Sequence, residues 1–109
     1  MIVGDPASKK DFIWIPWDGA PVDGMRFRNS SSNDEDYDIG VQPPGVYQHW
    51  ALIADGAGSI EAYYNNASLG RRSISTALTI TSVGHAFNSA VHSMKGQIDE
   101  LYLYDDAID

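Results

Sequence analysis

The chain has 109 residues, which is enough for one domain with one hydrophobic core, and we expect residues 1–109 to form a single domain. Its 15 acidic residues against 7 Lys and Arg give a net charge of −8. This charge argues against binding to nucleic acids or anionic membranes, because both need clustered basic side chains. The sequence has no cysteine, which excludes disulfides, thiolate metal sites and cysteine nucleophiles.

The distribution of apolar residues predicts an all-β protein. Apolar positions do not recur with a helical period; instead, short runs rich in Ile, Val, Tyr, Trp and Thr alternate with clusters of Gly, Pro, Asn and Asp. In chain order, the predicted strands are residues 11–17, 24–29, 37–41, 48–55, 59–64, 67–69, 75–83 and 95–104. Residues 29–35 are predicted to form a polar loop, and residues 71–72 a solvated bend.

Three segments, in this order, together form a recognisable pattern of strands and turns: residues 45–70, 78–85 and 96–109. The first has an aromatic residue and His49 ahead of an apolar strand, then an Asp-Gly turn and a strand that ends in Tyr-Tyr-Asn-Asn. The second reads as a strand before a loop. The third, GQIDELYLYDDAID, reads as a closing strand with an acidic end.

This pattern resembles the C-terminal part of laminin-G-like domains, which belong to the concanavalin-A-like lectin/glucanase sandwiches. The resemblance implies an antiparallel jelly-roll β-sandwich, here compact or truncated because the opening strands of the family are not found. The chain could be a compact variant, a fragment, or a half-sandwich completed by another copy. In the family the first and last strands are sheet neighbours, so a closing strand at residues 98–104 without its partner would expose an edge. We therefore expect a homo-oligomer.

Three acidic residues form a candidate metal site. Asp34, Asp36 and Asp38 alternate, so in an extended segment they point to one side and could bind calcium, which prefers oxygen ligands. Calcium also binds many laminin-G-like domains. The alternative is a solvated acidic loop, and no other cofactor is expected.

Aromatic residues give the best candidates for ligand binding. Sugar rings stack on aromatic faces while neighbouring polar groups bond their hydroxyls, and we select Trp17, Tyr63, Tyr102 and Tyr104 as candidate ligand-binding residues. Tyr102 and Tyr104 share one face of the predicted last strand, opposite two leucines. The alternative is that these aromatic side chains fill the core or a subunit interface.

Catalysis is not expected from this sequence. Asp99 and Glu100 are adjacent and would face opposite sides of a strand, whereas a glycosidase needs two carboxyl groups about 5–9 Å apart across one bond. The spaced carboxylates of the related glucanases are missing, and the histidines have no metal-ligand spacing.

The function that we expect is non-catalytic, lectin-like recognition of a glycan or a protein surface. The alternative is a structural or assembly protein, such as a virion decoration or oligomeric subunit, and a divergent glucanase ranks third. The N-terminal residues do not form a signal peptide, and the family resemblance favours an extracellular or virion-surface location.

Overall fold

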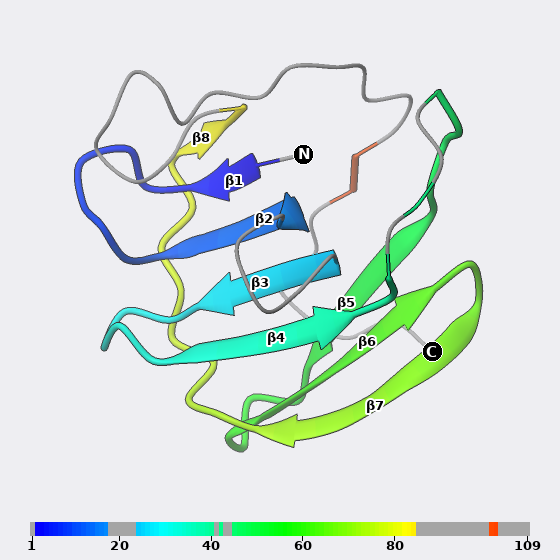
Figure 1. The fold of residues 1–109 in the computed structure, drawn as a ribbon. Coiled ribbons are helices and arrows are strands. Elements are labelled where there is room, and N and C mark those ends of the chain that lie inside the picture. The colour runs from blue at the N-terminus through cyan, green and yellow to red at the C-terminus, as the bar shows by residue number, and fades with distance from the viewer. Residues whose placement is uncertain (1, 18–23, 41, 43–44, 85–100, 103–109) are drawn as a thin grey trace.

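A computed structural model describes residues 2–17, 24–40, 42, 45–84 and 101–102 (Figure 1). These residues form strands and no helix, which confirms the prediction of an all-β protein. The strands are β1 (Ile2–Gly4), β2 (Phe12–Trp17), β3 (Gly24–Arg28), β4 (Asp34–Asp38), β5 (Trp50–Ala54), β6 (Ser59–Tyr64), β7 (Ala67–Ser73) and β8 (Ser82–Val83).

The strands make two antiparallel sheets that pack as a sandwich. One sheet has five strands in the order β4-β3-β2-β1-β8, and the other has three in the order β5-β6-β7 (Figure 1). The first four strands follow one another as a meander. β8 then returns to pair with β1, so that Val3 lies opposite Val83.

The core lies between the two sheets. On β3, Met25 and Phe27 are buried and the two arginines beside them are not, which is the alternation of a strand with one buried face. Ile60 and Ala62 of β6 close the core from the three-stranded sheet. Burying a large apolar side chain contributes about 1.5–3 kcal/mol, so this contact between sheets is the main source of stability.

A buried tyrosine links β4, an edge strand of the five-stranded sheet, to β7, an edge strand of the three-stranded sheet. Tyr37 of β4 is only 1% exposed, and its hydroxyl donates a hydrogen bond to the Gly70 carbonyl of β7 at 2.9 Å. The Arg72 guanidinium lies over the Tyr37 ring, 4.6 Å from its centroid, and donates to Glu35 at 3.2 Å. Burial raises the pKa of Tyr37, so the hydroxyl stays protonated and can donate.

Two asparagines make the turn between β6 and β7. Asn65 and Asn66 have φ of 48° and 69°, as a type I′ turn requires at both positions. The sequence correctly predicts this turn, because asparagine tolerates the left-handed conformation better than most residues.

Several boundaries differ from the prediction. β4 begins at Asp34, inside the predicted polar loop, and β7 continues through the predicted bend to Ser73. In the predicted strand 75–83, only residues 82–83 pair, and β1 was not predicted at all. Of the predicted strand 95–104, only residues 101–102 lie in the described part of the chain, and they are not assigned to a strand.

Across the residues that the structure describes, there is no helix long and apolar enough to cross a lipid bilayer.

Candidate functional site

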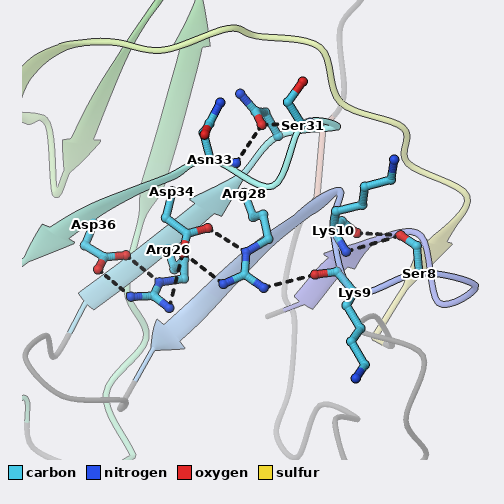
Figure 2. A network of polar contacts seen from close by, with 10 residues as sticks. Ser8, Lys9, Lys10, Arg26, Arg28, Ser31, Asn33, Asp34 and Asp36 are labelled. Atoms are coloured by element: carbon cyan, nitrogen blue, oxygen red, sulfur yellow. Dashed lines mark hydrogen bonds and ion pairs between the residues drawn. The ribbon is translucent and has the colours of Figure 1, made fainter.

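Two of the three predicted calcium ligands, Asp34 and Asp36, lie in a network of ion pairs on the outer face of the five-stranded sheet (Figure 2). The register of β3 and β4 places Arg26 opposite Asp36 and Arg28 opposite Asp34. The Nε and Nη2 atoms of Arg26 donate to the two carboxylate oxygens of Asp36, both at 2.7 Å. Arg28 binds Asp34 in the same bidentate way, at 2.6 and 2.9 Å.

This network continues onto neighbouring elements. Nη1 of Arg28 donates to the Lys9 carbonyl at 3.0 Å, in the loop between β1 and β2 (Figure 2). The Arg28 guanidinium also lies 4.9 Å from the centroid of the Phe12 ring on β2, and Trp14 packs edge-on against the same ring. The hydrogen bond to Asp36 raises the pKa of Arg26. These contacts hold the acidic strand β4 onto the sheet; the bonds between Arg26 and Asp36 are half-buried, and those of Arg28 are exposed.

In this arrangement the three aspartates do not fit a calcium ion. Both oxygens of Asp34 and both of Asp36 accept hydrogen bonds from guanidinium groups, and Oδ1 of Asp38 accepts one from the Gly40 backbone amide. Calcium takes six to eight oxygen ligands, so the arginines would have to leave before it could bind. Among the described residues, no group of three His, Cys, Asp or Glu side chains could hold a metal ion. Calcium binding stays an untested prediction from the sequence, and the contacts of Asp34 and Asp36 with the two arginines argue against it.

A second polar cluster lies on the outer face of the three-stranded sheet. Because residues alternate along a strand, the inward-facing Ile60 and Ala62 place Glu61 and Tyr63 on the outer face. We call the group around them the Glu61 cluster. It consists of Asp55, Ser59, Glu61, Tyr63, Ser68 and Arg71.

Glu61 is the centre of this cluster. Its Oε2 accepts a hydrogen bond from the Ser68 hydroxyl at 2.7 Å, and its Oε1 lies 3.7 Å from Nη2 of Arg71. The Ser68 hydroxyl and then the Tyr63 hydroxyl lower the pKa of Glu61, and the same contact with Glu61 raises the pKa of Tyr63. Glu61 therefore stays ionised in a fixed position.

Arg71 connects Glu61 to a second carboxylate. Its Nη1 lies 3.4 Å from Oδ2 of Asp55, at the start of the turn between β5 and β6. The Ser59 hydroxyl donates to the same Oδ2, and this bond is the largest of the causes that lower the pKa of Asp55. The cluster thus presents two carboxylates, one guanidinium and three hydroxyl groups on one face.

The structure places two of the four predicted ligand-binding residues in different sheets. Trp17 ends β2 in the five-stranded sheet, whereas Tyr63 lies in the three-stranded sheet. Tyr102 is 65% exposed, and Leu101 beside it is half-buried. Tyr104 lies outside the described residues.

The sequence analysis missed the contact between Glu61 and Arg71 because of a β-bulge. Counting outward from the turn pairs Tyr63 with Ser68, and would then pair Glu61 with Gly70. One extra residue on β7 shifts the register, so that Arg71 lies opposite Glu61 instead. Gly70, with φ of 103°, allows this irregularity.

Comparison with protein families, with characterised proteins and with solved structures finds no match to this chain.

Proposed function

We propose that this protein is a non-catalytic, lectin-like recognition module, and that its ligand binds on the outer face of β5, β6 and β7. One observation carries the proposal. Tyr63, a candidate ligand-binding residue from the sequence, lies beside a carboxylate whose position is fixed by Ser68 and Arg71. An aromatic ring next to fixed hydrogen-bonding groups can take the apolar face and the hydroxyls of a sugar together.

The electrostatics of the cluster favour binding over glycoside hydrolysis. A glycosidase needs one carboxylic acid with a raised pKa to protonate the leaving group. The pKa values of Asp55 and Glu61 are both lowered, and both carboxylates contact Arg71. Two carboxylates that are ionised at neutral pH can accept hydrogen bonds from a ligand, but neither is suited to act as a general acid there.

Glycan-array binding followed by calorimetry tests this proposal. We expect Tyr63→Ala to weaken glycan binding about tenfold or more, as the truncation of an aromatic hot-spot residue does at an interface. Tyr47→Ala is the matched control, because Tyr47 is 65% exposed and lies outside the cluster. Tyr102→Ala tests whether that exposed ring also contacts the ligand. Equal binding by wild type and Tyr63→Ala would contradict the placement of the site, and no binding to any glycan would contradict the glycan ligand.

The alternative function, assembly with other copies of the chain, is favoured by a different observation. Val46, Tyr47 and Ile53 are large apolar side chains that are 61%, 65% and 41% exposed, on β5 or the segment before it. Like β7, β5 is also an edge strand of its sheet among the described strands, and edge strands can pair with another chain. Light scattering separates the two functions, because an assembly protein stays oligomeric on dilution and loses that state in Ile53→Glu. A monomer at all concentrations would contradict assembly.

We further propose that the two sheets belong to a jelly roll of the concanavalin-A-like type. The support is the laminin-G-like order of segments from residue 45 onward, together with the described two-sheet antiparallel architecture. An experimental structure that shows the last predicted strand pairing in the five-stranded sheet would agree with this topology, and pairing in neither sheet would contradict it.

A further inference from the structure

We propose that the ligand of the Glu61 cluster is a glycan without acidic groups, and that Asp55 and Glu61 impose this selectivity by holding Arg71. The inference rests on the proposed function and goes beyond it, because it names the ligand chemistry and the residues that determine it.

The contacts of Arg71 are the first step of the argument. Its side chain is 64% exposed, and a guanidinium at a protein surface is the group that best binds a carboxylate or sulfate in bidentate geometry. Here, however, one terminal nitrogen contacts Asp55 at 3.4 Å and the other contacts Glu61 at 3.7 Å. An acidic ligand would have to compete with two carboxylates that belong to the protein.

The charge of the face is the second step. Two carboxylates against one guanidinium leave the cluster net negative, and the whole chain carries −8. Since the pKa values of Asp55 and Glu61 are both lowered, these charges persist throughout the neutral range. A uronate or sulfate group near them is repelled, and like charges brought together at a binding surface oppose binding.

The alcohol contacts are the third step. Each carboxylate already accepts a hydrogen bond from a serine hydroxyl, Asp55 from Ser59 and Glu61 from Ser68. A sugar hydroxyl is the same kind of donor, and a carboxylate with two oxygens can accept further bonds on its solvent side. The cluster therefore matches hydroxyl groups in chemistry and charge.

The experiment compares two ligand classes on two charge-matched double variants. The neutral probes are cellohexaose and maltohexaose, and the acidic probes are a hyaluronan hexasaccharide and hexagalacturonate. Asp55→Asn with Glu61→Gln removes both anions from Arg71 but keeps oxygen acceptors for the two serines. Asp5→Asn with Asp38→Asn is the control, because it removes the same charge elsewhere and also keeps the oxygens that accept hydrogen bonds from Ala7 and Gly40.

We expect wild type to bind a neutral probe and to reject the acidic probes. The Asp55→Asn/Glu61→Gln variant should gain affinity for an acidic probe by about tenfold, because each exposed charge contact changes an affinity by up to about fivefold. The control should not gain it, and added salt should reduce the gain. Near-UV spectra of the variants check that the fold is intact.

Different outcomes contradict the inference and the proposed function. Wild-type binding to an acidic probe in preference to the neutral ones would overturn the selectivity and leave glycan recognition standing. An equal gain in affinity for an acidic probe in both double variants, or no gain in either, would show that Asp55 and Glu61 do not prevent Arg71 from binding acidic ligands. Failure of wild type to bind either class would contradict the proposed function, and this inference with it.

Discussion

Replacing Tyr37 by phenylalanine tests how the two sheets are joined. The substitution removes one oxygen, which donates to the Gly70 carbonyl at 2.9 Å, and keeps the ring that packs under Arg72. Losing the hydrogen bond that this buried side chain donates, and leaving a half-buried carbonyl without that donor, costs about 1–2 kcal/mol. For a chain of this size that loss lowers the melting temperature by roughly 4–8 °C. Thermal and urea denaturation followed by tryptophan fluorescence would measure it.

Tyr64→Phe is the matched control for this prediction. Its hydroxyl donates to Oε1 of Gln42 at 3.2 Å, but both side chains are half-buried, so water can replace the lost bond. We expect a cost below about 0.5 kcal/mol. If Tyr37→Phe unfolds at the same temperature as wild type, or if the two variants cost the same, the bond to Gly70 does not join the sheets.

The same substitution has a signature at alkaline pH. Burial raises the pKa of Tyr37 above its ordinary value of 10.0, so the unfolded chain gives up this proton before the folded protein does. The stability linked to this shift is complete below pH 10.0 and is lost as the pH rises through the raised pKa. Tyr37→Phe should therefore lose less stability above that pH than wild type. Parallel alkaline profiles would contradict the shift.

Three further predictions concern the turns and the charged clusters. Asn29→Ala should lower the free energy of unfolding by about 2–4 kcal/mol in urea denaturation. The buried Asn29 side chain accepts hydrogen bonds from the backbone amides of Ser31 and Asn33 and donates one to the Ser75 carbonyl. A loss of stability below about 1 kcal/mol would contradict this role. Calcium and a chelator should leave the melting temperature unchanged, because guanidinium groups occupy Asp34 and Asp36; a rise with calcium would show that the arginines give way. The pKa values of Asp55 and Glu61 are lowered on folding, so the stability that they contribute is present above their ordinary pKa values and is lost as the pH falls through the lowered ones. Asp55→Asn/Glu61→Gln should flatten that acid loss in pH-dependent melts, and a slope equal to that of wild type would count against it.

Local sequence pattern predicted the strands whose alternation is complete. Residues 59–64 were predicted with the bounds that β6 has, because apolar residues alternate there and a pair of asparagines follows. β2 and β3 were each predicted within one residue of their ends for the same reason.

The acidic run DEDYD shows why the start of β4 was predicted wrongly. Taken alone, three aspartates and a glutamate repel one another and favour a solvated loop. They form β4 because Arg26 and Arg28 on β3 lie opposite Asp36 and Asp34, and Tyr37 enters the core. The conformation of this segment is determined by its pairing with β3, and the local sequence does not show which strand will be the neighbour.

The candidate site was predicted only in part. Tyr63 was selected for its ring, and the structure supplies the polar groups beside it. The bulge opposite Ala62 determines that Arg71 reaches Glu61, and a one-residue change of register cannot be read from residue types.

The pairing of β1 with β8 has a consequence for how the protein is made. Val3 and Val83 are neighbours in the sheet although 80 positions separate them along the chain. The ribosome must therefore release residue 83 before β1 can pair with β8. The hairpin of β6 and β7, by contrast, can close as soon as β7 has left the ribosome, because only a two-residue turn separates the two strands. Pairings between distant segments slow folding and extend the time during which incomplete sheets are exposed. The outer edge of β1 therefore stays unpaired until Ser82 and Val83 have been synthesised.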